Sequence, residues 1–515
     1  MAAVAVGQSS LALATEPLPR KLRVGLFADS ALQPRWLVEA FAKVAASGFA
    51  QIVLVATAHR AAAARPWPWR LYGALDRRIF APRAQHDELL ELARYVPHEA
   101  SALREARLDV AFALGDIEDR ELDGVARYGV WRFFGDGLSE VVEGAPLSAS
   151  GLEVRLAAGA EPRIAYQSWS RTYPLSVARN RAQLLAKTAE FPWRALREAQ
   201  RYGRGWLEQC PAHKPPDAAA TPALTPIVKR IFARGLERAL HREQWFLAFR
   251  HGNGNEAIPA DLAGFTRLMP PAGRIWADPF VIERGGRHYV FFEDLPFAAG
   301  RGHIAMLEID SHGRWSAPVR VLERDHHLSY PFLLEHEGAL YMVPESAQAG
   351  TVELYRCTEF PLGWRRERVL LEGVRLVDAT LEHVAGRWWL FANGAPGASR
   401  VFDDELYLYH AERLTGDWQP HERNPVKSDA RCARPAGRLY WRGGALYRPA
   451  QICVPRYGAG VSVNRVLRLT PQHYAERQVE RIMPSPESGL YGLHTVNRAG
   501  ALTVVDAFTR RLRFA

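Results

Sequence analysis

The stretch WADPFVIERGGRHYVFFED, residues 276–294, decides the fold: a polar residue opens a short apolar strand, and a glycine turn leads into an aromatic-rich return strand. Related copies follow at a period of about 50 residues, namely SYPFLLEHEGALYMVPES (329–346), VDATLEHVAGRWWLFANG (377–394), ARPAGRLYWRGGALYRPAQ (433–451) and LHTVNRAGALTVVDA (493–507). One such hairpin cannot bury both of its faces, but five packed radially around an axis can. The repeat therefore predicts an all-β, five-bladed propeller.

Polar residues at fixed places in the repeat are expected to meet at the propeller axis. The leading residues of the five copies are Asp278, Tyr330, Asp378, Arg434 and His494. A second polar residue stands near the end of each return strand: Glu293, Glu345, Asn393, Gln451 and Asp506. Because the strands of a hairpin are antiparallel, its first and last residues lie on the same rim. We therefore expect one axial pocket in which several acids and an arginine converge.

The ring also needs closing strands, because the last copy ends near the C-terminus without outer strands of its own. Two strand-like runs precede the first copy, QWFLAFR (Gln244 to Arg250) and GFTRLMP (Gly264 to Pro270). We expect them to complete blade five, so that the propeller comprises residues 243–515.

The N-terminal half has a different pattern. KLRVGLFADS, AQIVLVAT and LDVAFALGD are typical of buried strands, and PRWLVEAFAKVAASG between the first two has helical periodicity. Residues 21–205 are thus predicted to form an open, mostly parallel α/β sheet. Residues 1–20 are expected to be disordered, 206–225 to form a Pro/Ala-rich linker and 226–242 a connecting helix. The first strand and turn lack a dinucleotide fingerprint, and we expect no cofactor.

Composition narrows the class of protein. The 515 residues are 48% hydrophobic and 24% charged, as in a folded chain of more than one domain. The formal charge of +10 comes from scattered arginines without a reader motif, so no nucleic-acid partner is expected. The four cysteines are widely spaced, which indicates neither disulfides nor a metal site. We expect no transmembrane segment and, because no positive charge precedes the apolar run at the N-terminus, a cytoplasmic location.

The segment DVAFALGDIEDRELDGVARYGVWRFFGD, Asp109 to Asp136, resembles the core of the formyltransferase family. In that family an Asn-x-His strand carries formyl transfer, and here Arg132 and Phe134 stand at those two positions. The catalytic Asp of the family has no counterpart either. Without a general acid/base and an amide donor this chemistry cannot run. The resemblance therefore implies a degenerate formyltransferase-like scaffold over residues 21–205, and sugar formylation is an alternative that Arg132 and Phe134 argue against.

The second half has its own resemblance. The phrases WADPF, LSYPFLLEHEGALYMVPES, LVDATLEHVAGRWWLF, RPAGRLYWRGGALYRPAQ and YGLHTV together resemble the five-bladed propeller at the N-terminus of plant glucosamine inositolphosphorylceramide transferase. The resemblance covers residues 243–515. In the plant protein the transferase activity is ascribed to a separate C-terminal domain, so the likeness alone does not imply glycosyl transfer.

At the level of fold, the ring also looks like the five-bladed glycosidases that act on arabinan, xylan and fructan. That likeness implies Asp278, in Ala-Asp-Pro, as base or nucleophile and Asp378 as an orienting acid. The general acid of those enzymes is a blade-four Glu, where this chain has Arg434. Glu345 is the replacement that we expect.

These observations lead to one hypothesis and two alternatives. The hypothesis is an enzyme that acts on a glycan or sugar nucleotide at an anomeric carbon, by hydrolysis, phosphorolysis or transfer. Its catalytic residues would be Asp278, Glu345 and Asp378, and its substrate-binding residues Arg434, His494, Tyr330, Glu293, Gln451 and Asn393. One alternative is a non-catalytic saccharide-binding module that serves a partner glycosyltransferase. The other is sugar formylation by the N-terminal half, against which Arg132 and Phe134 argue. The acids can instead be structural, since an Asp-Pro can cap a turn and a return-strand acid can bind amides of the next blade.

Overall fold

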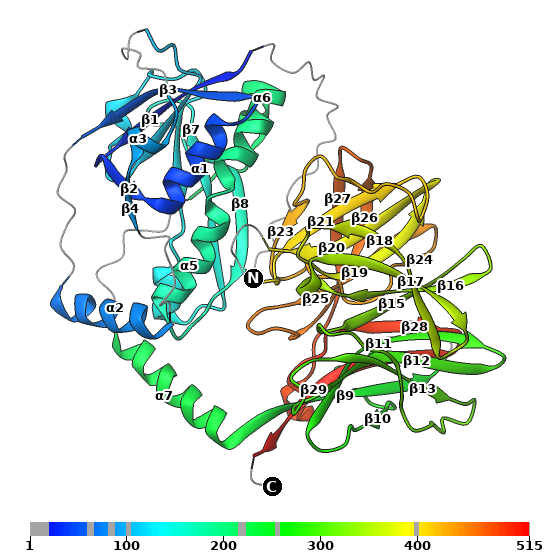
Figure 1. Ribbon diagram of the computed structural model, residues 1–515. Helices are drawn as coiled ribbons and strands as arrows, with labels where there is room; N and C mark the ends of the chain where they lie inside the picture. Colours follow the sequence, from blue (N-terminus) through cyan, green and yellow to red (C-terminus); the bar gives the residue numbers. More distant parts are fainter. Residues whose placement is uncertain are drawn as a thin grey trace. The chain divides into compact units, whose positions relative to one another are not determined.

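The computed structural model describes residues 20–58, 66–80, 88–98, 105–214, 223–252, 258–395 and 401–513. This part of the chain forms two compact units (Figure 1). The first contains most of the residues up to 224, and the second contains residues from 225 onward together with two short segments, 140–148 and 169–175. Except for Arg20, the segment predicted to be disordered lies outside the described residues.

A six-stranded sheet forms the centre of the first unit, within the residues described. Its order is β3 (Ala50–Thr57), β1 (Leu22–Ala28), β5 (Val110–Leu114), β6 (Val130–Phe134), β7 (Leu147–Arg155) and β8 (Arg163–Arg171). The first four strands in this order are parallel, and β7 is antiparallel to β6. Strand β5, with the sequence VAFAL, is buried at every position, as expected for a strand covered on both faces. The predicted open α/β sheet is therefore present.

Amphipathic helices and a small two-stranded sheet complete this unit. They are β2 (Leu32–Pro34), α1 (Arg35–Ala45), α2 (Trp67–Phe80), β4 (Leu89–Glu91), α3 (Leu92–Tyr95), α5 (Val177–Thr188) and α6 (Phe191–Gln209). The short helix α4 (Leu138–Glu143) begins in this unit and continues into the segment 140–148. Helices α5 and α6 are separate although only two residues divide them. Pro192 explains the break, because proline fits the first turn of a new helix and not a helix interior. Among the helices in the described ranges, none is both long and apolar enough to cross a bilayer.

The end of the α/β unit differs from the predicted boundary at residue 205. Helix α6 continues to Gln209, and the next residues add to the edge of the sheet. The backbone N–H of Ile164 donates to Pro211 (2.8 Å), and that of His213 donates to Pro162 (2.7 Å). Only residues 215–222 of the predicted linker lie outside the described chain, before α7 (Thr225–Leu240) begins.

The second unit is a five-bladed propeller, which confirms the prediction from the repeat. Blade one is β11 (Arg274–Arg284), β12 (Arg287–Pro296), β13 (His303–Ile309) and β14 (Val319–Leu322); blade two is β15 (Ser329–His336), β16 (Ala339–Glu345), β17 (Thr351–Glu359) and β18 (Gly363–Glu372). Blade three is β19 (Leu376–Val384), β20 (Arg387–Gly394), β21 (Glu405–Ala411), β22 (Gln419–Pro420) and β23 (Lys427–Ser428). Blade four is β24 (Tyr440–Arg442), β25 (Ala445–Ile452), β26 (Gly460–Leu469) and β27 (Tyr474–Ile482).

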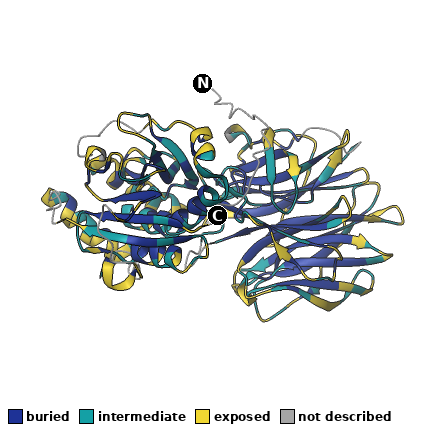
Figure 2. Ribbon diagram, turned by 90° about the horizontal axis from the view of Figure 1, so that it is seen from above, coloured by how far each residue is buried: buried dark blue, intermediate teal, exposed yellow. Residues whose placement is uncertain are grey.

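Blade five joins the two ends of the propeller sequence. Its strands are β28 (Val496–Ala499), β29 (Leu502–Leu512), β9 (His241–His251) and β10 (Thr266–Leu268). Strands β9 and β29 are antiparallel and paired from Leu502 opposite His251 to Leu512 opposite His241. Of the two runs expected to complete this blade, the first lies within β9 and the second contains β10. Buried residues follow the inner strands, and exposed residues gather at the turns (Figure 2).

Candidate functional site

The leading polar residue of each of the first three blades sits in a β-bulge. Strand pairing skips residues 278–279, 330–331 and 378–379. Asp278, Tyr330 and Asp378 have positive φ angles of 53°, 43° and 56°. Such backbone costs a non-glycine residue of order 1–3 kcal/mol, and a bulge re-aims the side chain of its strand. The repeated strain therefore falls on the positions that the sequence places at the axis.

The return strands place their polar residues at the same end of the blades as the leading polar residues. Glu293 pairs with Ala277, Glu345 with Ser329, and Asn393 with Val377, so each stands beside the residue that precedes a bulge. In the last two blades the backbone N–H of Gln451 donates to Arg434 (2.7 Å) and that of Asp506 to Thr495 (3.3 Å). All five blades thus present a leading and a returning polar residue at one end of their inner strands.

Asp278 lies in a buried network with blade five. Its backbone N–H donates to the Asp506 carboxylate (2.8 Å), and the Thr495 hydroxyl donates to its Oδ1 (2.8 Å). His494 Nδ1 lies 2.6 Å from Asp506 Oδ2 and 3.7 Å from Asp278 Oδ1. Burial raises the pKa of Asp278 to about 6; His494 opposes that rise, and the charges of Asp378 and Asp506 add to it. At neutral pH most of the Asp278 carboxyl is still ionised and can act as a base.

Glu345 titrates higher than Asp278. Its carboxylate accepts hydrogen bonds from the backbone N–H of Ala347 (2.8 Å) and the hydroxyl of Ser329 (3.0 Å). Burial nevertheless raises the pKa of Glu345 to about 7, and these hydrogen bonds only partly offset it. Glu345 is therefore partly protonated at neutral pH, which is the state a proton donor needs.

Glu293 lies among the other acids and beside a histidine that the sequence analysis missed. Burial, followed by the charges of Asp278 and Glu345, raises the pKa of Glu293 well above its usual range. Nε2 of His327 lies 3.4 Å from Glu293 and 3.9 Å from Glu345. Nδ1 of His327 accepts the backbone N–H of Gly302 (2.9 Å), so the neutral ring carries its proton on Nε2, facing both acids. Burial lowers the pKa of His327, which favours this neutral form.

Asp378 is held between blades three and four. Arg434 donates to it through Nε (2.6 Å) and Nη2 (3.4 Å), and Gln451 donates through Nε2 (3.0 Å). Arg434 also donates to the carbonyl of Phe402 (2.9 Å). In the structure, Arg434 is thus the counter-ion of Asp378, and Gln451 positions the same carboxylate; contact of either residue with a substrate stays a prediction.

Tyr330 and Asn393, which the sequence predicts as substrate-binding residues, are fully buried at the axial end of their blades. The Tyr330 hydroxyl accepts the backbone N–H of Gly437 (2.8 Å) and bonds to Thr380 Oγ1 (2.8 Å), which ties blade two to blades three and four. The side-chain amide of Asn393 has no hydrogen-bond partner within the described ranges. An unpaired buried amide costs about 1–3 kcal/mol, so a water molecule or a ligand atom would be stabilising there.

Two aromatic side chains outside the repeat complete the site. Trp245, in β9, stacks on His494 with ring centroids 4.3 Å apart. Tyr457, in the loop after β25, lies under the Arg434 guanidinium at 4.7 Å and beside His494 at 5.2 Å. Burial lowers the pKa of His494, but the carboxylates of Asp506 and Asp278 outweigh burial and raise it overall. His494 is thus enclosed by protein groups instead of facing an open pocket.

One cluster has the composition of a metal site, although the sequence indicated none. Ligand-type atoms of Asp278, His494 and Asp506 lie within 4.8 Å of one another. Two carboxylates and an imidazole suit a divalent cation. Here, however, these groups bond to one another and Asp506 accepts the backbone N–H groups of Asp278, His494 and Thr495, so the cluster satisfies its own hydrogen-bonding needs.

Comparison with known families identifies relatives of the propeller. Residues 268–504 match the family model described as "Glucosamine inositolphosphorylceramide transferase 1, N-terminal". The transferase of that name from Arabidopsis thaliana is 34% identical over 230 residues, which are 44% of this chain and 30% of that protein. The one from Oryza sativa subsp. japonica is 36% identical over 232 residues, 44% of this chain and 31% of that protein. The chain thus spans under a third of the length of these relatives.

The chain is also similar to solved structures of glycoside hydrolases. A family 117 glycoside hydrolase from Zobellia galactanivorans is 11% identical, with a TM-score of 0.34, over 52% of this chain and 90% of that one. An arabinanase from Bacillus subtilis is 11% identical, with a TM-score of 0.32, over 45% of this chain and 93% of that one.

Proposed function

We propose that this chain is a carbohydrate-active protein that acts on a glycan or sugar nucleotide at an anomeric carbon, through the axial carboxylates of its propeller. The observation that carries the proposal is the convergence of buried acids from the first three blades at one end of their inner strands, where burial raises the pKa of both Asp278 and Glu345. Pairs of carboxyl groups whose environments separate their protonation states provide the acid and the base of glycosidic chemistry. The family match to transferases named for glucosamine supports the substrate class.

Each acid then has a role that follows from its environment. Glu345, partly protonated, would give its proton to the leaving oxygen. Asp278, mostly ionised, would activate a water or acceptor hydroxyl, or attack the anomeric carbon directly. Asp378, held by Arg434, would fix the charge of the site and orient the sugar. Glu293 and His327 lie beside Glu345: a negative charge on Glu293 would favour the protonated form of Glu345, whereas the Nε2–H of His327 would donate to whichever of the two carboxylates is ionised.

A binding module that serves a partner glycosyltransferase is the second candidate. The side chains of the acids are 7% (Asp278), 9% (Glu293), 11% (Glu345) and 2% (Asp378) exposed, which counts against their reaching a reacting bond and leaves a saccharide to bind elsewhere on the propeller. A binding module also fits the length comparison, because the matched relatives contain about 70% of their chain outside the shared region.

For the N-terminal unit we propose the degenerate formyltransferase-like scaffold that the sequence suggests. Arg132 donates to the backbone carbonyl of Ile117, and the ring of Phe134 packs against His213 with centroids 4.2 Å apart. Both side chains at the positions expected to carry formyl transfer thus make packing or backbone contacts. Neither is a general acid/base or an amide donor, so sugar formylation has no support from this strand.

The test is turnover and binding across a panel of glycosides and sugar nucleotides, measured by product chromatography and calorimetry. Asp278→Asn and Glu345→Gln should each lower kcat by about 10²–10⁴-fold, the usual contribution of a general acid or base, while binding persists. Glu337→Gln is the control, because its side chain is 83% exposed in the same hairpin as Glu345. Turnover that survives in folded Asp278→Asn refutes the catalytic assignment. Binding without turnover by the unchanged protein favours the module.

A further inference from the structure

Helix α7, which leads directly into β9 of the propeller, exposes its large apolar side chains (Figure 1). Val228, Phe232, Leu236 and Leu240 follow one another at every fourth position, and all four are exposed. Phe232 is 77% exposed and Leu236 63%. Because residues four apart lie on the same side of a helix, these side chains form one apolar stripe, about 18 Å long at the usual helical rise.

Polar contacts on the other side of α7 fix the helix to the propeller unit. Arg230 donates to the backbone carbonyl groups of Val142 (3.0 Å) and Pro174 (3.2 Å). Glu237 forms an ion pair with Arg510 of β29. A surface helix normally buries its apolar stripe and exposes its polar side, and in α7 this arrangement is reversed. A helix that is held in place with its apolar stripe exposed marks an interaction surface.

The charges exposed around this stripe are mainly positive. The backbone N–H of Arg513 donates to the carbonyl of Leu240 (2.9 Å), so the end of β29 adjoins the end of α7. Residues 225–243 and 509–513, all of them described, contain eight lysines or arginines and two glutamates. Glu243 is the one exposed acid in these two ranges, and it pairs with Arg510 across β9 and β29. The exposed cations are Lys229, Arg238, Arg511 and Arg513.

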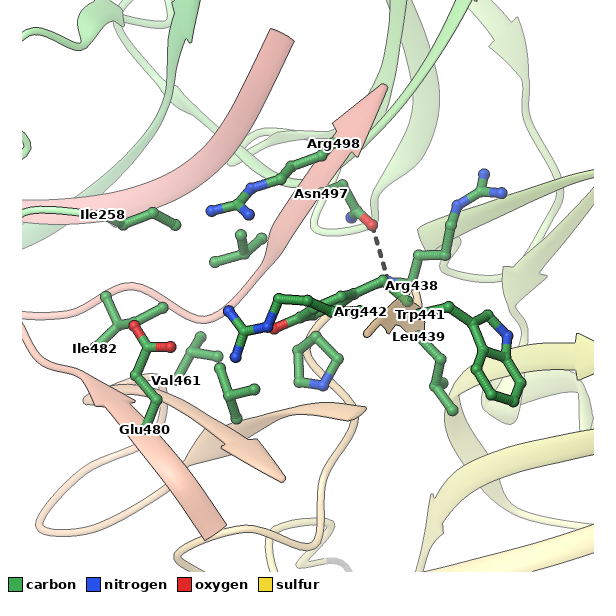
Figure 3. A pocket seen from close by; sticks show the side chains of 14 residues that line it. Ile258, Arg438, Leu439, Trp441, Arg442, Val461, Glu480, Ile482, Asn497 and Arg498 are labelled. Carbon is green, nitrogen blue, oxygen red and sulfur yellow. Dashed lines mark hydrogen bonds between the residues drawn. The ribbon is translucent and has the colours of Figure 1, made fainter. Parts of the chain in front are cut away.

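The cavity between blades four and five does not offer this combination. Its aliphatic side chains line a hollow, whereas the stripe of α7 lies on the surface. Figure 3 shows the carboxylate of Glu480 and the guanidinium groups of Arg442 and Arg498 in the same lining. Charges of both signs therefore accompany the apolar side chains of the cavity. Around α7 an exposed apolar stripe is combined with an excess of positive charge.

We propose that α7 and the end of β29 bind the surface of an anionic lipid bilayer. The apolar stripe enters the boundary between headgroups and acyl chains, and the exposed cations contact the negatively charged headgroups. A bilayer needs no groove of matching shape, which suits a stripe that is exposed along its whole length. Helix α7 lies along the surface, because its 16 residues are too few to cross the hydrocarbon core. This binding does not depend on the proposed carbohydrate chemistry.

The test measures binding of the full chain to two kinds of vesicle by co-sedimentation over a range of lipid concentrations. One kind consists of phosphatidylcholine alone, and the other also contains phosphatidylserine. The unchanged protein should bind the vesicles with phosphatidylserine at least tenfold more tightly. Added salt should weaken this binding, because it screens the attraction between the exposed cations and the headgroups.

One pair of variants tests the apolar stripe. Phe232→Gln/Leu236→Gln should lower the affinity for vesicles with phosphatidylserine at least tenfold, because apolar surface no longer enters the bilayer. Glutamine is a good helix former, so α7 itself should be retained. The matched control is Val319→Gln/Leu362→Gln, which replaces two apolar residues that are exposed elsewhere on the propeller and should leave the affinity unchanged.

A second pair of variants tests the cations. Lys229→Glu/Arg511→Glu should lower the same affinity at least tenfold. The control Arg314→Glu/Arg365→Glu changes the net charge equally, at side chains that are 78% and 70% exposed, and should lower the affinity by much less. If Phe232→Gln/Leu236→Gln does not fold, this second pair must still give the expected difference.

Three results would overturn the proposal. The first is equal binding to the two kinds of vesicle, because the positive charge would then play no part. The second is unchanged vesicle binding in a folded variant of the stripe or of the cations. The third is a dimer that Phe232→Gln/Leu236→Gln separates while no vesicles are bound, because a second copy of the chain would then cover the stripe. Asp278→Asn should leave vesicle binding unchanged, which separates this surface from the carboxylate site.

Discussion

Glu345 should make the propeller less stable as pH rises, and Glu345→Gln should remove this effect. The ordinary pKa of a glutamate is 4.5, and burial raises that of Glu345 to about 7 in the folded chain. Between these two values the folded state keeps a proton that the unfolded state has released. Stability therefore falls with rising pH through this window, and it becomes level, for this group, above about pH 7.

The size of the effect follows from the two pKa values. One pH unit of difference between folded and unfolded pKa is worth 1.36 kcal/mol, so Glu345 should cost about 3 kcal/mol at pH 7.5 relative to pH 4. A glutamine has the same shape, carries no charge and can still accept the hydrogen bond of Ala347 through its carbonyl oxygen. The stability of Glu345→Gln relative to the unchanged protein should thus rise by about 3 kcal/mol over this range.

Urea unfolding followed by tryptophan fluorescence at pH 4, 5.5 and 7.5 measures the difference between the two proteins. The N-terminal unit contributes equally to the unfolding of both proteins, so its contribution cancels in the difference between their free energies of unfolding. The difference in free energy of unfolding between Glu337→Gln and the unchanged protein should be the same at all three pH values, because the Glu337 side chain is 83% exposed. If the difference for Glu345→Gln is also constant with pH, Glu345 titrates as an ordinary surface acid. It could not then be the proton donor at neutral pH, and the reasoning about the axial site fails.

Two further predictions concern the architecture. Glu476→Gln should lower the free energy of unfolding of the propeller by about 3–5 kcal/mol at pH 7, because buried Arg448 and Lys427 lose the carboxylate that they share. Urea unfolding measures this free energy. A loss below about 1 kcal/mol would contradict the prediction. A chain that ends at residue 501 lacks β29 and therefore the pairing of β29 with β9 that joins the two ends of the ring. The propeller should then lose its cooperative thermal transition, measured by near-UV circular dichroism. A retained transition would mean that the ring closes without this strand.

The repeat in the sequence was sufficient to predict the number of blades and the end of the inner strands at which the polar residues lie. Asp278, Tyr330 and Asp378 share a register because each copy has the same alternation of apolar residues and the same turn, and both are local properties of a hairpin. Even the pairing of Glu293, Glu345 and Asn393 with the residue before each bulge follows from their common offset. Sequence reasoning was therefore sufficient for the positions of these residues along the strands.

Only the tertiary structure decided which of these side chains are available for chemistry. Arg434 is bound to Asp378, from the neighbouring blade, and His494 is enclosed by Trp245 and Asp506. These contacts join segments far apart in the chain, and whether a carboxyl keeps its proton depends on how deeply all of them bury it. His327 stands outside the repeat, and the cavity beside Arg498 forms only where two blades pack together, so no local pattern could reveal either one.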